Sequence, residues 1–219
     1  MRVAVVVPVY GNEVTLEPLV TRLAAALSDH DWSVHLVVDA SPDRSAAVAS
    51  RLGADPRVVP QVLPVNVGQH RALAAGLAAA DGADAWVCLD ADLQDPPEAV
   101  PALLDRLAAG DVAAVFAGRR GSYEGPVRLL TGRLHRALVS RLTGLPPDAG
   151  AFLALDGRAR GAVLRLQAPS LVAAIGAARL PVASVPVERA PREVGRSAWT
   201  ARARLRQSVR TLAWTLRNR

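Results

Sequence analysis

Short apolar runs alternate with helix-like segments throughout the first 120 residues. The apolar runs are residues 3–9, 33–38, 57–63, 85–89 and 112–117. Between them, leucine, valine and alanine recur at helical spacing in segments 13–28, 45–52, 70–80 and 97–109. Runs that are apolar throughout are typical of strands buried on both faces, as in parallel sheets. The alternation therefore predicts an α/β fold, a Rossmann-like, mostly parallel sheet with helices on both faces.

Polar residues gather where each predicted strand ends. These clusters are residues 10–13, 39–43, 66–70, 90–95 and 118–120. A core does not require polar side chains after every strand. In open α/β sheets, ligands bind beyond the carboxyl ends of the strands. The pattern therefore predicts a ligand site along that edge of the sheet.

The second half of the chain has weaker periodicity. Residues 127–142 have the pattern of a basic amphipathic helix, and residues 182–187 that of another strand. In segment 198–219 the apolar residues follow helical spacing, with arginines on the other face: Leu205, Val209, Leu212 and Leu216. We expect one domain over residues 1–197, divided near residue 120, followed by a basic amphipathic helix over 198–219.

The charge of the chain is positive and uneven. The net charge is +6, and no acidic residue follows Glu193, whereas arginines continue to Arg219. This tail suggests contact with an anionic surface, and without a recognisable nucleic-acid motif we expect a membrane surface rather than nucleic acid. The alternative is a helix packed on the domain with its basic face in solvent. No apolar stretch reaches the roughly 18 residues of a membrane span, and no signal peptide is expected. The single cysteine, Cys88, lies in an apolar run and is expected to be a buried, inert thiol.

Two carboxylates suggest a metal site. Asp90 and Asp92 are one residue apart, in the turn that follows the fourth predicted strand. Carboxylate oxygens in such a turn suit Mg²⁺ or Mn²⁺, which also keep room for phosphate oxygens. The alternative is that Asp92 or Asp95 only caps the helix that begins near Pro97.

Five sequence motifs, in order and at matching spacing, resemble family 2 of the glycosyltransferases. They are VVVPVYGNE (5–13), VVDASPD (37–43), NVGQHRALAAGL (66–77), LDADLQDPPE (89–98) and GRR (118–120). The resemblance implies the GT-A nucleotide-sugar fold. The motifs are most similar to the polyprenyl-phosphate group: dolichol-phosphate mannosyltransferases, bactoprenol glucosyltransferases and undecaprenyl-phosphate aminoarabinose transferases.

The resemblance also implies roles for individual residues on the donor side. It predicts a UDP- or GDP-linked sugar as donor, bound by Pro8, Tyr10, Glu13, Asp39, Asn66, Gly68 and Asp90. Asp39 matches the acid that reads the base ring, although a turn-forming aspartate is the alternative. The expected metal ligands are Asp90, Asp92 and Gln94, with Mg²⁺ or Mn²⁺ as cofactor. His70 is interpreted as a residue at the start of a helix.

On the acceptor side, the resemblance implies a cationic site for a polyprenyl phosphate. The expected phosphate-binding residues are Arg119, Arg133, Arg192 and Ser197. A phosphate monoester is largely dianionic at neutral pH and needs positioning rather than a strong base. In-line attack would invert the anomeric configuration. The residues expected to take part in catalysis are Asp92, Arg119 and Asp148.

The acceptor half departs from the family pattern in two places. The string from Asp148 to Ala154 lacks the family's later acid and arginine, and Ser197-Ala198-Trp199 lacks its lysine. Three hypotheses therefore stay open. The first is an inverting polyprenyl-phosphate glycosyltransferase, cytoplasmic and peripheral at the inner membrane face. The second is a relative acting on a soluble acceptor such as a specialised metabolite, with Asp148 as base. The third is a catalytically silent homologue that binds a nucleotide sugar.

Overall fold

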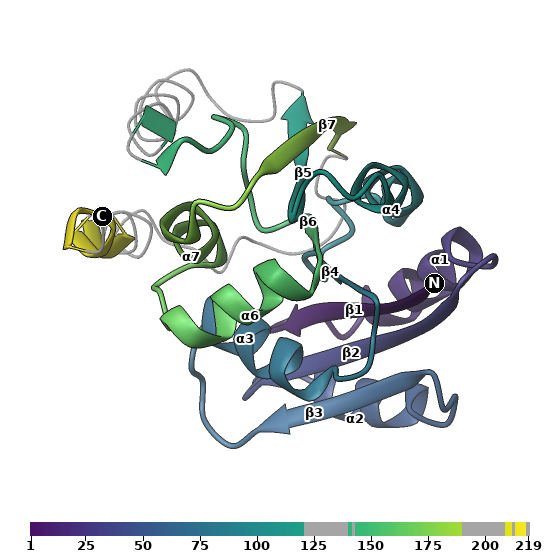
Figure 1. The fold of residues 1–219 in the computed structure, drawn as a ribbon. Helices are drawn as coiled ribbons and strands as arrows, with labels where there is room; N and C mark the ends of the chain where they lie inside the picture. The colour runs from purple at the N-terminus through teal and green to yellow at the C-terminus, as the bar shows by residue number, and fades with distance from the viewer. Residues whose placement is uncertain (121–139, 142, 190–208, 212, 218–219) are drawn as a thin grey trace.

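The first half of the chain alternates between strands and helices (Figure 1). The computed structural model describes residues 1–120, 140–141, 143–189, 209–211 and 213–217. The elements of the first half are β1 (Arg2–Val9), α1 (Leu16–Ala26), β2 (Asp31–Asp39), α2 (Ser45–Leu52), β3 (Val58–Leu63), α3 (Gln69–Ala79), β4 (Ala85–Cys88), η1 (Pro97–Ala99), α4 (Val100–Ala108) and β5 (Ala114–Arg120). Each lies within a few residues of the segment that the sequence predicts.

The second half adds two strands and two helices to these. They are β6 (Leu153–Leu155), α6 (Gly157–Leu166), α7 (Leu171–Ala178) and β7 (Val182–Glu188). Both helices begin at capping side chains: Asp156 accepts a hydrogen bond from the Ala159 N–H, and Ser170 from the Ala173 N–H. The predicted strand at 182–187 is confirmed. Most of the predicted helix 127–142 lies outside the described residues.

All seven strands form one sheet in the order β3-β2-β1-β4-β6-β5-β7. β6 pairs antiparallel with both of its neighbours, and every other pairing is parallel. The predicted mostly parallel sheet is therefore confirmed. Because β6 reverses direction between β4 and β5, the remaining six strands all end at the same edge. That edge gathers the polar segments that follow β1, β2, β3 and β4, together with Arg189 at the end of β7.

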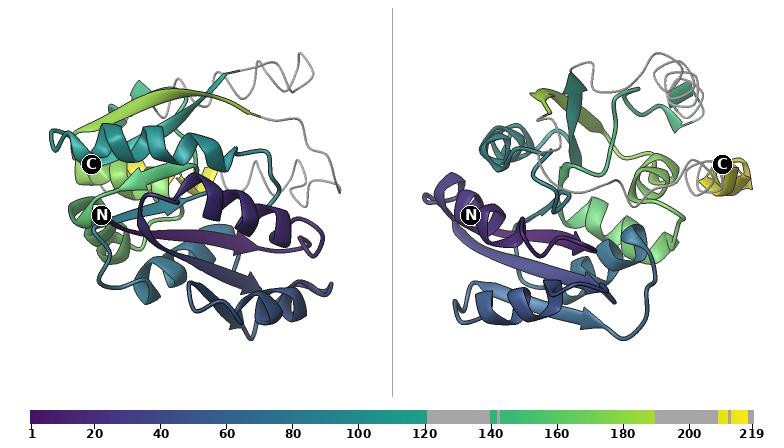
Figure 2. Two further views of the ribbon diagram at one scale, coloured as in Figure 1. Left: turned by 90° about the vertical axis from the view of Figure 1, so that its right-hand side faces the viewer. Right: turned by 180° about the vertical axis from the view of Figure 1, so that it is seen from behind.

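Helices cover both faces of the sheet (Figures 1 and 2). Alternate residues of β1 point to opposite faces. Val5 and Val7 belong to a core shared with α1, α2 and α4, whereas Ala4 and Val6 belong to a core shared with α3, α6 and α7. Each of these four β1 side chains is at most 2% exposed. The two cores hold the sheet rigidly between helix layers, which fixes the loops at its carboxyl edge.

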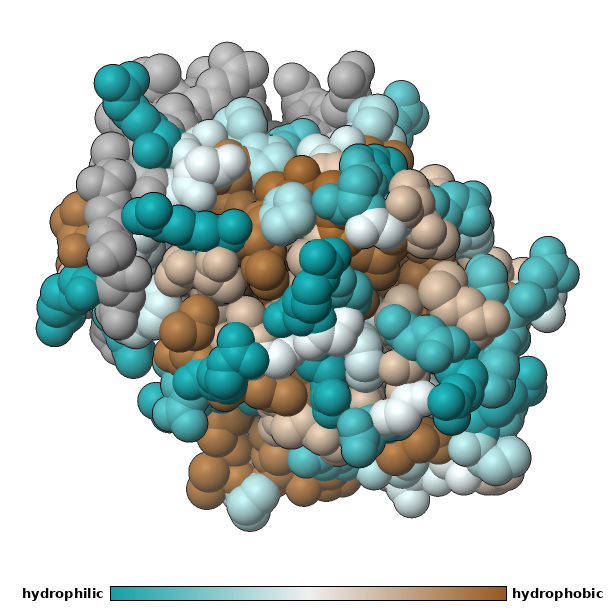
Figure 3. Space-filling model, viewed as in Figure 1, coloured by the Kyte–Doolittle hydropathy of each residue, from teal (hydrophilic) through white to brown (hydrophobic). Residues whose placement is uncertain are grey.

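The outer surface mixes polar and apolar side chains (Figure 3). Apolar side chains gather where the edge strand β3 lies, and Val62 and Val65 are each more than half exposed. Pro60 lies within β3 and has no N–H to offer a further strand. In the described part of the chain, no single helix is long and apolar enough to span a membrane. Together α6 and α7 reach that length, but they are bent by 109°.

The C-terminal segment is described over residues 209–211 and 213–217, which are helical. Val209 and Leu216 are each 57% exposed, whereas Thr211 and Thr215 are buried. Val209 and Leu216 are seven positions apart and therefore lie on one side of the helix. The predicted helix is present over these residues, and part of its apolar side faces outward.

Candidate functional site

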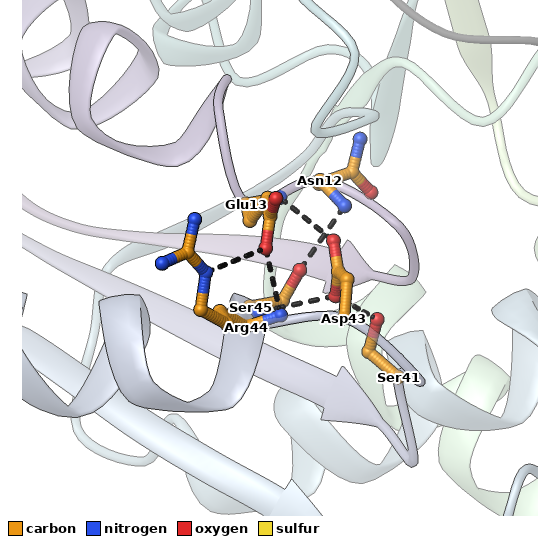
Figure 4. A network of polar contacts seen from close by, with 6 residues as sticks. All are labelled: Asn12, Glu13, Ser41, Asp43, Arg44 and Ser45. Carbon is orange, nitrogen blue, oxygen red and sulfur yellow. Dashed lines mark hydrogen bonds and ion pairs between the residues drawn. The ribbon is translucent and has the colours of Figure 1, made fainter.

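The loops after β1 and β2 are joined by a network of hydrogen bonds (Figure 4). Glu13, a predicted donor-binding residue, accepts a hydrogen bond from the Arg44 N–H at 2.8 Å. The Glu13 N–H in turn donates to Asp43 Oδ2 at 3.1 Å. The Asn12 N–H donates to the Ser45 hydroxyl at 3.1 Å. Glu13 therefore fastens the two loops together at the edge of the sheet.

Asp43 lies at the centre of this network. Burial by itself raises the pKa of its carboxyl group. Four hydrogen bonds have the opposite, larger effect and lower the pKa to about 2. They come from the hydroxyls of Ser41 and Ser45 and from the N–H groups of Ser45 and Glu13. Asp43 is consequently ionised at any physiological pH. An ionised carboxylate that accepts this many hydrogen bonds gives the two loops a fixed shape.

The other two predicted residues of the first loop lie at the end of β1. Pro8 is part of β1 and pairs with Val37 of β2. Tyr10 follows β1, is 44% exposed, and its N–H donates to Asn12 Oδ1 at 3.0 Å. An exposed aromatic ring at the sheet edge offers a surface on which a planar base can stack.

Asp39 ends β2 and is 3% exposed. Its two carboxylate oxygens accept hydrogen bonds from the Val67 N–H at 2.7 Å and the Gly68 N–H at 2.8 Å. The side-chain amide of Asn66 donates to the Asp39 carbonyl at 3.1 Å. Gly68 has φ of 88°, a left-handed conformation that glycine adopts without strain. The structure thus brings together Asp39, Asn66 and Gly68, as predicted, and Asp39 sets the shape of the loop that begins α3.

The turn after β4 holds the two predicted metal-binding carboxylates. Gln69 Nε2 donates to Asp90 Oδ1 at 2.5 Å, and the Gln94 N–H donates to Asp92 Oδ1 at 3.1 Å. Leu93, between Asp92 and Gln94, has a backbone φ angle of 61°, which is strained for a residue with a bulky side chain. The Thr15 hydroxyl donates to the Ala91 carbonyl at 2.7 Å and anchors the turn to the start of α1. The turn is therefore held from both sides in a conformation that its own sequence does not favour.

Arg189 reaches the same turn from the end of β7. Its Nε donates to Asp95 Oδ1 at 3.0 Å, and its Nη2 lies 3.6 Å from Asp90 Oδ2. Asp95 is 1% exposed, and its Oδ2 accepts a hydrogen bond from the Asp90 N–H at 3.4 Å. Asp95 thus lies inside the turn, paired with a cation, rather than capping the helix that follows.

The donor set of this turn fits a divalent cation that binds together with phosphate groups. Among the described residues, no group of three or more His, Cys, Asp or Glu side chains is placed to hold a metal ion by itself. Mg²⁺ is commonly bound by one or two carboxylates, with substrate phosphates completing its shell. Asp90 and Asp92 supply such a pair, and Gln94 lies in the same turn. The residues therefore suit a metal that arrives with a diphosphate, and suit a solitary structural metal poorly.

The acceptor side is described only in part. Arg119 lies in β5, paired through its backbone with Val187, and its side chain lies outside the described part of the structure. Arg133, Arg192 and Ser197 also lie outside the described residues. The structure therefore leaves their predicted roles as predictions.

Asp148 lies against β5 and β7. Its Oδ2 accepts a hydrogen bond from the Ser184 hydroxyl at 3.1 Å. Its Oδ1 is buried and has no hydrogen-bond partner among the described residues. Gly118 leaves the space for this carboxylate, because a Cβ atom at position 118 would overlap Asp148 Oδ2. A buried acceptor without a partner is costly, which makes Asp148 a candidate for contact with a bound ligand.

Two further predictions concern single side chains. Cys88 is fully buried, and burial, with the nearby charge of Asp90, raises the pKa of its thiol to about 12. This confirms an inert thiol. His70 lies in the first turn of α3, as predicted, and burial lowers the pKa of its imidazole to about 4. An imidazole with this pKa is neutral at physiological pH. The His70 Nδ1 is buried without a hydrogen-bond partner in the described structure.

Sequence reasoning missed three residues that shape the site: Gln69, Asp43 and Arg189. Asp43 and Gln69 lie inside two of the five sequence motifs. Asp43 is four residues after Asp39, and Gln69 directly follows Gly68. Arg189 directly follows β7 and lies two residues after the end of the strand predicted at 182–187. The rule that polar residues at strand ends build the site would have found it.

Comparison with known proteins gives consistent matches. The family model described as glycosyl transferase family 2 matches residues 4–152. Undecaprenyl-phosphate 4-deoxy-4-formamido-L-arabinose transferase of Pectobacterium carotovorum is 38% identical over 148 residues, which are 65% of this chain and 44% of that protein. The Pseudomonas aeruginosa protein of the same name is 40% identical over 159 residues, 69% of this chain and 45% of its own. The chain thus spans less than half the length of these relatives.

Two solved structures share the fold at low sequence identity. Glucosyl-3-phosphoglycerate synthase from Mycobacterium tuberculosis, in complex with Mn²⁺, UDP and phosphoglyceric acid, has a TM-score of 0.70 at 20% identity, covering 99% of this chain and 78% of that one. Mannosyl-3-phosphoglycerate synthase from Rubrobacter xylanophilus has a TM-score of 0.66 at 17% identity, and the match covers 99% of this chain and 73% of that one. The sheet and its helix layers therefore have the GT-A architecture.

Proposed function

Because this chain belongs to glycosyl transferase family 2, we propose that it transfers a sugar from a nucleoside diphosphate to a polyprenyl phosphate, with inversion at the anomeric carbon. One observation carries the proposal: the Asp39 loop and the Asp90–Asp92 turn meet at one edge of the sheet, joined by the Gln69–Asp90 hydrogen bond. The donor half, residues 1–120, supplies this edge.

The donor would lie across the carboxyl ends of β1, β2 and β4. We assign the nucleotide base to the surface beside Tyr10 and Glu13, with Pro8 and the buried Asp39 beneath it. We assign the sugar to the loop of Asn66 and Gly68. Asp90 and Asp92, with Gln94 beside them, would hold a divalent cation, Mg²⁺ or Mn²⁺. Such a cation would stabilise the negative charge that develops on the departing diphosphate. The relative from Mycobacterium tuberculosis is named as binding Mn²⁺ and UDP, which supports this class of donor.

The acceptor would approach from the side of β5 and β7. A phosphate acceptor is already anionic, so the protein has to position it beside an anionic donor. We assign this role to Arg119, Arg133, Arg192 and Ser197. The relatives at 38–40% identity are named as undecaprenyl-phosphate transferases, which supports a polyprenyl phosphate as the acceptor.

A membrane surface would present such an acceptor. Val209 and Leu216 expose apolar surface on one side of the C-terminal helix, and arginines such as Arg210 and Arg217 belong to the same helix. Exposed apolar residues together with arginines suit a helix that lies in the headgroup layer. We propose that segment 198–219 attaches the domain, residues 1–197, to the inner membrane face.

A second candidate is transfer to the hydroxyl of a soluble acceptor. Asp148 favours it, because its buried Oδ1 has no partner among the described residues and a hydroxyl acceptor needs a base. The relatives of similar fold are named as synthases of glycosyl-3-phosphoglycerates. These two candidates differ in the acceptor and share the donor site.

The test is a panel of UDP- and GDP-sugars, each incubated with Mn²⁺ or Mg²⁺, with and without undecaprenyl phosphate. Asp92→Ala is compared with Asp29→Ala, the same substitution at an exposed position. Metal-dependent formation of a lipid-linked sugar, reduced at least about 100-fold in Asp92→Ala alone, supports the proposal. Hydrolysis or transfer to a soluble phosphorylated acceptor without a lipid product supports the second candidate. Absence of donor binding would contradict both and leave a catalytically silent homologue.

A further inference from the structure

Arg189 is joined to the turn after β4 although the two segments are far apart in the sequence. Its guanidinium lies 3.0 Å from Asp95 Oδ1 and 3.6 Å from Asp90 Oδ2. The side chains of Arg189, Asp95 and Asp90 are 19%, 2% and 24% exposed. This ion pair is therefore largely shielded from solvent, where electrostatic interactions are stronger than at an open surface.

The two carboxylates relate differently to this arginine. Asp95 is the buried partner, and a carboxylate buried this deeply requires a cation or several hydrogen-bond donors. Asp90 belongs to the proposed metal- and donor-binding pair. Arg189 is thus fixed by Asp95 and placed beside Asp90.

A fixed positive charge at this point acts oppositely on the two ligands of the site. It weakens binding of a divalent cation to Asp90 in the absence of a donor, because the guanidinium and the metal ion are both positively charged and compete for the same carboxylate. It attracts the diphosphate of a donor, because guanidinium groups form strong, geometrically specific hydrogen bonds with phosphate oxygens. The site is then biased toward binding metal and diphosphate together.

We propose that Arg189 is a donor-binding residue that weakens binding of the metal alone and strengthens binding of the metal together with a nucleoside diphosphate. This inference rests on the proposed donor site and concerns how that site is charged. It assigns to β7, in the acceptor half, a direct contribution to the donor.

The test measures two affinities in one set of variants. Binding of Mn²⁺ alone is followed by the electron paramagnetic resonance signal of the free ion, and binding of UDP and GDP at saturating Mn²⁺ by calorimetry. In Arg189→Gln we expect Mn²⁺ alone to bind about tenfold more tightly and the nucleotide about tenfold more weakly. Arg189→Lys keeps the charge and should restore most of both effects.

Two controls separate charge from folding. Because Arg189→Gln leaves Asp95 buried without its cation, the same substitution is also made in an Asp95→Asn background, and D95N is compared with D95N/R189Q. Arg106→Gln breaks an exposed ion pair with Asp111, which precedes β5 at the opposite edge of the sheet, and should change neither affinity.

The outcomes are distinguishable. Opposite changes in the two affinities, in both backgrounds, support the inference. A loss of both affinities, or no change in either, would show that Arg189 only stabilises the turn and would overturn the inference. If the wild-type protein binds neither UDP nor GDP with Mn²⁺, the proposed function itself fails, independently of Arg189.

Discussion

Gly118 of β5 lies directly against the carboxylate of Asp148, so closely that a methyl group at position 118 would overlap it. The same carbon would also lie 2.5 Å from the Ser184 hydroxyl. Gly118→Ala must therefore displace Asp148 or bend β5, and we expect a loss of about 1–3 kcal/mol in unfolding free energy. Urea unfolding measures this loss. Gly157→Ala, where the new methyl meets nothing within 4 Å, should stay within about 0.5 kcal/mol of wild type. Equal effects of the two substitutions would contradict the close approach.

Asp39 holds the loop before α3 through two N–H groups, so its charge matters for the shape of that loop. Asp39→Asn turns an NH₂ group toward one of these donors and leaves that donor without an acceptor. We expect a loss of about 1–3 kcal/mol in unfolding free energy. Nucleotide binding should weaken with it, because Asn66 and Gly68 lose their fixed position. Calorimetry measures the nucleotide affinity, and urea unfolding measures the unfolding free energy. Asp29→Asn, at an exposed position, is the control, and a similar change there would argue against a specific role of Asp39.

His70 makes stability depend on pH in a defined direction. Burial lowers the pKa of its imidazole from 6.5 to about 4, so the unfolded chain binds the proton more readily than the folded protein between these values. The His70 contribution to stability is complete above about pH 6.5 and is lost as the pH falls toward 4. We expect His70→Gln to reduce the fall in unfolding free energy over this window. His35, whose pKa burial also lowers, is present in both proteins and cancels in the comparison. Parallel pH profiles would rule out the assignment to His70.

Leu93 stores backbone strain in the turn between Asp92 and Gln94. Its φ of 61° costs an ordinary residue roughly 1–2 kcal/mol and costs glycine almost nothing. Both Leu93→Ala and Leu93→Gly lose the packing of the side chain, so their difference isolates the backbone. We expect the glycine variant to be the more stable by about 1 kcal/mol in urea unfolding. Alanine and glycine compared at the exposed position 102, inside α4, should show the reverse order, with Ala102→Gly less stable than the wild-type protein. A more stable alanine variant at position 93 would mean that the turn is not strained.

Much of the fold follows from local patterns. The predicted helix at 45–52 coincides with α2, and the apolar runs match the strands that two helix layers bury. Periodicity is informative there because each element contacts a core on a predictable side. β6 was missed because three residues carry no periodicity. α6 and α7 were missed although Asp156 and Ser170 are recognisable capping residues.

The site was predictable in its location but only partly in its contacts. Asp39, Asn66 and Gly68 lie together because the loops that carry them follow neighbouring strands, β2 and β3. The pairing of Arg189 with Asp90 depends on where β7 enters the sheet, which no local pattern encodes. The sequence also favoured a ligand-binding role for Glu13, whereas in the structure its carboxylate bonds to the Arg44 backbone. Whether a donor also contacts Glu13 remains a prediction.

The position of β6 between β4 and β5 has a consequence for how the chain folds as it is synthesised. β1 to β4 can pair with one another as soon as they leave the ribosome, because each has its sheet neighbour among earlier or adjacent strands. β5 has none until residues 153–155 follow it, since β6 is its link to the rest of the sheet. β4 is meanwhile an open edge, a surface that invites pairing with other chains. Completion of the sheet is therefore a late step, and variants that slow β6 insertion should aggregate before they lose native stability.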